Sequence, residues 1–320
     1  MTPIPPPRRW ALLTGVPRSG TTFAGKVLAT PASVDYLHEP FNPDAGIEGV
    51  TRRYWWVDND SAEEPQARRL VEALQRYDVR FRTAVYARDS AWKARAKRLA
   101  GSRGRFTFRW AKVNPLHRTA LVKDPVGCLL TGYLVREHGF RAAVLLRHPV
   151  AVVHSFDRLG WPARDWLAAL RDQEELVARH LGDDLDVLGA DWETDWEAAA
   201  VLWRVLNRVM LSEAHTPGVV VVRHEDLSRD PVAGFRSVAV HLGLPWSARV
   251  RRRVQRLTSG GNRVEARGRK VQDFARDSAR LLDARLDSTA HARRARIFEI
   301  TEPVARAHYN EASFRMERSS

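Results

Sequence analysis

The strongest constraint on the fold of this chain is an alternation of short apolar runs with longer segments of helical periodicity. The runs RAAVLLR and VVVVR have the unbroken apolar character of buried strands. Strands that alternate with helices in this way predict an α/β fold, in which a central, mostly parallel sheet is flanked by helices on both faces. The strands are predicted at residues 10–15, 34–37, 120–123, 141–147 and 219–223.

Helices are predicted between these strands. Residues 198–211 place their apolar side chains at helical spacing, Pro149 suits the first turn of another helix, and Asp230 is a favourable N-cap. We expect a single domain over residues 9–320 after a flexible, proline-rich tail at residues 1–8, with a helical insertion or lid near residues 48–110, where the pattern is irregular. The helical segments are residues 21–29, 126–138, 198–211, 231–242, the segment that Pro149 opens, and the arginine-rich end of the chain from residue 281.

The charge balance favours an anionic ligand. Lys and Arg number 52 against 38 Asp and Glu, which gives a formal charge of +14 over 320 residues. Arginine binds phosphate and sulfate through paired N–H groups, so a nucleotide or a nucleic acid is the expected partner. A codon bias toward arginine would give the same excess, because net charge bears on partners and solubility and not on fold.

The remaining composition excludes several classes. Cys128 is the single cysteine, so an intrachain disulfide and a cysteine-rich zinc site are excluded, and a reducing, cytoplasmic location is expected. The apolar runs are far shorter than the roughly 18 residues of a membrane span, and the N-terminus has no signal-peptide pattern. No metal site is predicted.

Residues 15–22 (GVPRSGTT) lie between a predicted strand and a predicted helix, which is the setting of a phosphate-binding loop. Gly20 permits close approach of the backbone, and the free N–H groups of the first helical turn attract an anion. The spacing of Gly15 and Gly20 is that of the nucleoside-triphosphate loop G-x-x-x-x-G-K-[ST], but Thr21 stands where that loop has lysine. A small-molecule kinase of the P-loop class therefore stays an alternative that this departure disfavours.

The PxSGTT pattern of this loop resembles the 5′-phosphosulfate-binding loop of the sulfotransferase family. The resemblance, which is to bacterial members acting on carbohydrates or natural products, implies a P-loop-like fold and 3′-phosphoadenosine 5′-phosphosulfate (PAPS) as co-substrate. The activity implied is that of a PAPS-dependent sulfotransferase. The residues that it assigns to the loop are Pro17, Arg18, Ser19, Gly20, Thr21 and Thr22.

A second segment, residues 147–156 (RHPVAVVHSF), is similar to the family's 3′-phosphate-binding segment. Arg147 ends a core strand and Ser155 lies in the helix that follows. Ligands of open parallel sheets bind beyond the carboxyl ends of the strands, so both side chains can reach a phosphate there. Without the loop upstream, a strand-capping arginine and a surface serine would explain the same residues equally well.

Weaker similarities extend to the end of the chain. Residues 224–227 (HEDL) with Asp230-Pro231, and residues 276–278 (RDS), resemble further segments of the family. The stretch before the RDS segment lies where the family closes a basic loop over the 3′-phosphate, without a clean match. The candidates for that loop are Arg267, Arg269 and Lys270.

The resemblance also implies roles in catalysis. Transfer of a sulfonate needs a cation at the leaving 5′-phosphate oxygen and a base for the acceptor proton. Arg18 is placed for the first role, and Lys123 could supplement it. Residues 39–43 (EPFNP) look like the segment in which the family's glutamate is the presumed base, which makes Glu39 the candidate and His38 the second choice. A structural salt bridge to a nearby arginine is the alternative role for Glu39.

Other interpretations stay open. A basic nucleic-acid-binding protein rests on charge alone, because the chain has no helix-turn-helix, zinc-ligand or RNP-type signature. A family member that only binds nucleotide is a further possibility. The acceptor, a small molecule, a glycan or a natural product, is not identified by the sequence, nor is the oligomeric state. Four tryptophans could line an acceptor site but are expected in the core: Trp55, Trp56, Trp161 and Trp166.

Overall fold

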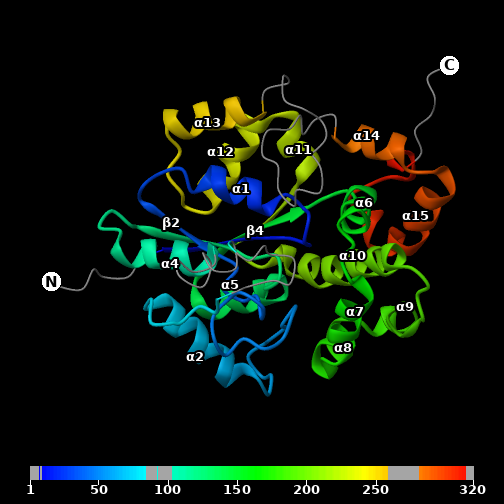
Figure 1. Ribbon diagram of the computed structural model, residues 1–320, viewed down its shortest axis with the longest axis horizontal. Helices are drawn as coiled ribbons and strands as arrows, with labels where there is room; N and C mark the ends of the chain where they lie inside the picture. The colour runs from blue at the N-terminus through cyan, green and yellow to red at the C-terminus, as the bar shows by residue number, and fades with distance from the viewer. Residues whose placement is uncertain (1–6, 8, 84–91, 93–102, 259–280, 315–320) are drawn as a thin grey trace.

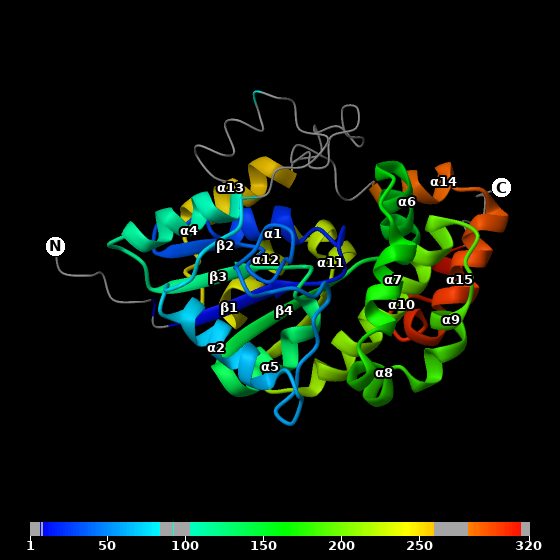
Figure 2. The same ribbon diagram turned by 60° about the horizontal axis from the view of Figure 1, so that its bottom comes forward.

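The computed structural model describes residues 7, 9–83, 92, 103–258 and 281–314. Its centre is a five-stranded sheet of order β2-β3-β1-β4-β5, and all four pairings of neighbouring strands are parallel (Figures 1 and 2). The predicted α/β fold with helices on both faces is therefore confirmed. The strands are β1 (Arg9–Thr14), β2 (Val34–His38), β3 (Thr119–Lys123), β4 (Phe140–Leu146) and β5 (Val219–Arg223).

Each central strand is buried on both faces because successive side chains point to opposite sides of the sheet. Leu12 of β1 belongs to a large core cluster that includes helix α10, whereas Leu13 belongs to a second cluster that includes α1 and α12. Both leucines are fully buried. Figure 2 shows α1, α12 and α13 on one side of the sheet and α5 on the other.

The helices fill the connections between the strands. They are α1 (Thr21–Leu28), α2 (Glu64–Gln75), α4 (Arg103–Val113), α5 (Thr131–His138), α6 (Pro149–Leu159), α7 (Ala163–Arg171), α8 (Glu174–His180), α9 (Leu185–Gly189), α10 (Asp195–Ser212), α11 (His224–Arg229), α12 (Pro231–His241), α13 (Ala248–Thr258), α14 (Leu281–Ser288) and α15 (His291–Ala305). Short 3-10 turns are η1 (Cys128–Leu130), η2 (Gly182–Asp184), η3 (Glu213–His215) and η4 (Glu311–Ser313).

Within the segment expected to be an insertion, the described residues form two helices. Helix α2 buries one apolar face in the larger core cluster. Helix α4 packs along β2, the edge strand, and both views show it beside that strand. Trp55 and Trp56 between them are buried in the core, so they do not form an acceptor wall.

Two parts of the fold differ from the sequence-based expectation. The helix predicted at residues 126–138 begins only at Thr131, because the N–H groups of Val126 and Gly127 donate to the Asp124 carboxylate and a 3-10 turn follows. Helices α7, α8 and α9, between β4 and α10, were not predicted. Of the expected N-terminal tail, only Pro7 lies within the described residues, and it is buried.

Candidate active site

The candidate site lies at the carboxyl ends of the strands, where every strand contributes a residue of interest. The glycine loop follows β1, Glu39 follows β2, Lys123 ends β3, Arg147 follows β4 and His224 follows β5. Because the strands are parallel, these ends share one edge of the sheet, and an open α/β sheet binds its ligands at that edge.

The glycine loop is shaped by two residues that need a left-handed backbone. Gly15 has φ of 142°, and a Cβ there would stand 2.2 Å from the Leu145 carbonyl oxygen. Gly20 has φ of 95° and caps α1, and a Cβ there would stand 2.7 Å from the His224 ring. An L side chain at either position would therefore force the loop or its neighbours to move. The loop delivers Thr21 to the first turn of α1, where N–H groups lack intrahelical partners.

The buried side chain of Ser19 is a candidate to bind a ligand. Its side chain is 1% exposed, and its hydroxyl has no hydrogen-bond partner among the described residues. A buried polar atom without a partner costs free energy, so such atoms are rare in folded proteins. The serine in the middle of the predicted phosphate loop thus has a hydroxyl available for an anion.

Arg18 and Arg147, which come from the two separated motifs, are in contact. The Arg147 guanidinium Nη1 donates to the Arg18 carbonyl oxygen over 2.7 Å, and Arg18 Nε donates to the Ser155 hydroxyl over 2.8 Å. The Arg18 guanidinium lies 5.4 Å from the centre of the Trp161 ring. On the other side, Trp203 Nε1 donates to the Arg147 carbonyl over 2.9 Å. The structure therefore brings the loop of β1 and the β4–α6 segment together.

Two residues near this edge have positive φ although they are not glycine. Arg18 has φ of 80° and Glu39 has φ of 52°. Left-handed conformations of such residues cost about 1–3 kcal/mol and occur at functional sites more often than elsewhere. The strained residues are two of those that the sequence proposed for catalysis.

Glu39 is held by three neighbours. Its Oε1 accepts a hydrogen bond from Lys123 Nζ over 2.5 Å, its Oε2 accepts from Asn42 Nδ2 over 2.9 Å, and His38 Nε2 lies 3.8 Å from Oε1. Burial raises the pKa of Glu39, but the charge of Lys123, with His38 and the hydrogen bonds, outweighs it and lowers the pKa to about 2. The ion pair is thus with lysine and not with the arginine considered from the sequence. Lys123 is fully buried, whereas Glu39 is partly open to solvent.

Asp124 fixes the turn that carries Glu39. Its Oδ2 accepts the Phe41 N–H over 2.6 Å and its Oδ1 accepts the N–H groups of Val126 and Gly127, both over 2.9 Å. Burial and the negative charge of Glu39 raise the pKa of Asp124 to about 7, although the N–H donors oppose the shift. One carboxylate thereby joins the loop after β2 to the loop after β3.

His38 is neutral at physiological pH. Burial, with the nearby charge of Lys123, lowers its pKa to about 3, and Tyr36 lies within hydrogen-bond distance of its Nδ1, at 3.3 Å. His38→Gln is therefore expected to leave the shape of the kcat/KM profile between about pH 5 and 8 unchanged, since a group that stays neutral does not titrate there. The measurement is the pH profile of both proteins. Loss of an acidic limb near pH 6.5 in the variant would instead make His38 a titrating base.

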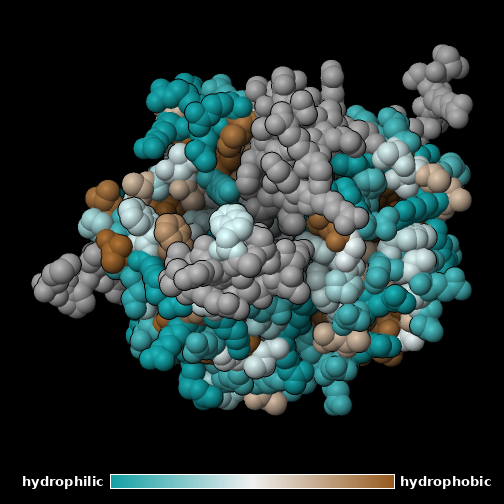
Figure 3. Space-filling model, in the orientation of Figure 1, coloured by the Kyte–Doolittle hydropathy of each residue, from teal (hydrophilic) through white to brown (hydrophobic). Residues whose placement is uncertain are grey.

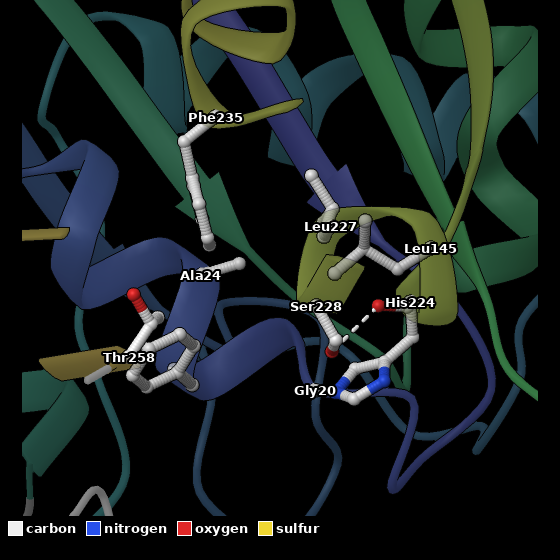
Figure 4. Close-up of a pocket in the computed structure, with 9 residues that line it drawn as sticks. Gly20, Ala24, Leu145, His224, Leu227, Ser228, Phe235 and Thr258 are labelled. Atoms are coloured by element: carbon white, nitrogen blue, oxygen red, sulfur yellow. Dashed lines mark hydrogen bonds between the residues drawn. The ribbon is translucent and has the colours of Figure 1, made fainter. Parts of the chain in front are cut away.

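Two pockets lie beside the loop and share His224 and Ser228. One is a cavity of about 250 Å³, open to solvent, whose lining includes the basic residues Arg147 and Arg229 and the acidic residues Glu225 and Asp283. The other is apolar, runs from Gly20 to Phe235 and has a volume of only about 10 Å³, close to the space of a single water molecule (Figure 4). It is lined by Gly20, Phe23, Ala24, Leu145, His224, Leu227, Ser228, Phe235 and Thr258.

The sequence singled out most of these residues but missed several that hold them. Asn42 and Asp124 position Glu39, and Glu225 accepts the His148 N–H over 3.0 Å. The available sequence signals were the EPFNP segment for Asn42, the HEDL segment for Glu225, and for Asp124 its position directly after Lys123. Pro17 lies in the loop, and Thr22 is the second residue of α1. The basic candidates Arg267, Arg269 and Lys270 fall outside the described residues.

Other residues of interest lie away from this edge or in the core. His148 is fully buried, and His154 accepts a hydrogen bond from Arg285 over 2.8 Å. In the described ranges, no three His, Cys, Asp or Glu side chains are grouped so that they could hold a metal ion, and no helix there is long and apolar enough to cross a bilayer.

The comparison with family models decides which family this arrangement represents. The model described as "Sulfotransferase family" matches residues 11–248, which span the sheet from β1 to the start of α13. The chain belongs to the sulfotransferase family. The matched range contains the glycine loop, Glu39, Lys123, Arg147 and Ser155. A search among curated protein sequences found no match for this sulfotransferase.

Several solved structures are similar to this sulfotransferase at low identity. The sulfotransferase domain of the Synechococcus PCC 7002 olefin synthase is 18% identical, with a TM-score of 0.42 and coverage of 94% of this chain and 96% of that one. The sulfotransferase domain from the curacin biosynthetic pathway is 14% identical, with a TM-score of 0.42 and coverage of 85% and 82%. Mouse sulfotransferase SULT7A1, complexed with PAP, is 12% identical, with a TM-score of 0.42 and coverage of 96% and 87%.

Proposed function

We propose that this protein transfers a sulfonate group from PAPS to a hydroxyl or amine of an acceptor molecule. The observation that carries the proposal is the contact between Arg18 and Arg147, supported by Ser155, at the edge where the glycine loop enters α1. A donor such as PAPS carries phosphate groups on both the 3′ and the 5′ side of its ribose, so its site needs more than one cation. Arg18 and Arg147 supply two cations from separate segments, beside an anion-binding loop. Membership of the sulfotransferase family supports the same conclusion.

The residues present fit such a donor. The unpartnered hydroxyl of buried Ser19 and the N–H groups at the start of α1 suit the 5′-phosphosulfate. Arg147 and Ser155 suit the 3′-phosphate, and the cavity beside Arg147 also contains Arg229. In this proposal PAPS supplies the activated sulfonate, and no metal is required.

Catalysis is assigned to the residues around Glu39. The acceptor oxygen or nitrogen bonds to sulfur while the bond from sulfur to the 5′-phosphate oxygen breaks. Glu39 takes the acceptor proton, which its ionised form can accept at neutral pH. Arg18 stabilises the negative charge that grows on the leaving oxygen, and Lys123 adds a second positive charge while it orients Glu39. The products are the sulfated acceptor and adenosine 3′,5′-bisphosphate (PAP).

The direct experiment is incubation of the purified protein with PAPS carrying ³⁵S and with an extract of the producing cells. Transfer of label to a discrete compound, which is then identified, supports the proposal and names the acceptor. Release of PAP without any labelled product in repeated extracts would contradict it.

Activity is expected to persist in EDTA, because the charge on the donor is met by arginine and lysine side chains. A P-loop kinase relies on Mg²⁺ at its nucleotide phosphates, so the same treatment would abolish its activity. The measurement compares turnover with EDTA and with added Mg²⁺, with PAPS and with ATP as alternative donors. Turnover that needs both ATP and Mg²⁺ would favour the kinase.

A further inference from the structure

Helix α4 presents an apolar stripe to solvent. Phe106, Trp110 and Val113 are 61%, 69% and 61% exposed. Their spacing places them on one side of the helix, since each residue advances about 100°. The buried residues Phe108 and Ala111 lie on the opposite side, against the core. Both sides of α4 are therefore apolar, whereas the outer side of a surface helix is ordinarily polar.

The stripe lies at one end of the molecule and continues past the helix. Leu116, just after α4, is 60% exposed. Figure 3 shows hydrophobic residues at the surface over and beside α4, at the left edge of the view. Exposed apolar residues occur singly on most proteins, but a run of large ones on one helix side marks a surface that meets another phase or partner.

Positive charge surrounds the stripe. Helix α4 (RGRFTFRWAKV) carries four basic residues and no acidic one. On a helical projection, Arg103 and Arg109 fall on either side of the Phe106–Trp110–Val113 line, about 60° from Phe106. An apolar strip bordered by arginines is the pattern of helices that lie in the surface of an anionic bilayer, with the apolar side among the acyl chains and the cations at the headgroups.

The basic surface extends from α4 to two other helices. Burial and the charges of Arg103 and Arg253 lower the pKa of Lys26, which places cations of α4, α1 and α13 near one another. Helix α13 (ARVRRRVQRLT) likewise has no acidic residue, and its Arg249, Arg251 and Arg252 are exposed. The buried side of α4 packs in the core cluster of the opposite sheet face from α1 and α13, so these cations meet around the edge of the sheet at β2.

The start of α4 lies beside the candidate active site. The first turn of α4 packs on the end of β2, where a Cβ on Gly104 would stand 3.0 Å from the His38 carbonyl oxygen. Glu39 is the next residue along the chain. A membrane that bound the outer side of α4 would therefore lie near Glu39, the residue proposed to take the proton from the acceptor.

We propose that α4, with the basic side chains around it, docks onto an anionic lipid surface and sets the active-site edge against it. Phe106 and Trp110 enter the headgroup region, and Arg109 and Lys112 contact lipid phosphates. Resting on the proposed function, the acceptor is then an amphiphile whose hydroxyl is presented at that surface. A nucleic acid would use the cations but not the apolar stripe, so the lipid surface accounts for more of the observations.

The test is co-sedimentation of the full chain with vesicles of phosphatidylcholine alone and of phosphatidylcholine mixed with phosphatidylglycerol. Binding is expected to the mixed vesicles and to weaken as salt increases. The double variant Phe106→Ser/Trp110→Ser should lose roughly tenfold or more in vesicle affinity. Since both side chains are exposed, we expect an unchanged fold, which circular dichroism checks. The matched control is Val240→Ser, which removes an apolar side chain that is 63% exposed on α12.

Three outcomes would overturn the proposal. These are absence of binding to mixed vesicles, equal vesicle binding by wild type and the double variant, and a dimer in sedimentation velocity that the double variant loses without any vesicle binding. Tight binding of RNA or DNA, equal in wild type and the double variant and unaccompanied by vesicle binding, would assign the surface to nucleic acid.

Because vesicle binding is measured without PAPS, its result is independent of the sulfonate-transfer assay. PAP affinity should be the same in wild type and the double variant.

Discussion

Replacing Glu39 with glutamine is expected to lower kcat by roughly 10²- to 10⁴-fold, the range in which a positioned base contributes to proton transfer. The amide keeps the shape of the side chain and can still accept a hydrogen bond from Lys123, but it cannot take up the acceptor proton. PAP binding should remain, since the residues assigned to the donor belong to other loops. The measurements are turnover with labelled PAPS and PAP affinity by calorimetry.

The PAP affinity of the Glu39→Gln protein also serves as the control for folding, because the substitution leaves buried Lys123 without its charged partner. Glu48→Gln, a change of the same kind at an exposed position nine residues later, should have wild-type turnover. A Glu39→Gln protein with near-normal kcat would show that Glu39 is not the base. Its ion pair with Lys123 would then be structural.

Replacing Arg147 with alanine is expected to weaken PAP binding by roughly tenfold to a hundredfold, because a hydrogen bond to a charged group is worth about 1.5–3 kcal/mol. Adenosine 5′-phosphate, which lacks the 3′-phosphate, should lose much less affinity. The difference between the two losses measures the contact with the 3′-phosphate. Calorimetry with both nucleotides on both proteins gives the four affinities.

Arg141→Ala is the matched control for this comparison. Arg141 lies on the same strand but near its amino end, where it donates to the His241 carbonyl over 3.2 Å. Its loss should leave both affinities unchanged. Equal losses for the two nucleotides in Arg147→Ala would remove the 3′-phosphate role, and would be explained by release of the Arg18 carbonyl that Arg147 holds.

The sequence predicted the parts of this molecule that depend on neighbouring residues. The strands are continuous apolar runs, and the loop before α1 has glycines at two of its three positions with left-handed backbone, the third being Arg18. The meeting of Arg18 with Arg147 followed from the rule that parallel strands end at one edge. Each of these signals is contained in a short stretch or in the order of the strands.

The rest depends on contacts between distant segments. The pairing of Glu39 with Lys123 arises because β2 lies beside β3 in the register that sets His38 opposite Lys123, and no local pattern specifies that neighbour. The delayed start of α5 depends on Asp124 accepting N–H groups. The exposed apolar side of α4 could not be predicted, because the segment that contains α4 has a polar, irregular pattern without a clear helical periodicity.

The hydrogen bond from the Arg147 side chain to the Arg18 backbone has a consequence for how the chain can vary. A guanidinium offers five N–H donors in a planar fork, so one side chain can brace a loop and hold a ligand at once. A lysine ammonium is a single point of charge on a flexible stem and does not offer this fixed geometry. Substitution by lysine would preserve the charge and still separate these two tasks, leaving the phosphate attracted but the strained residue 18 unsupported.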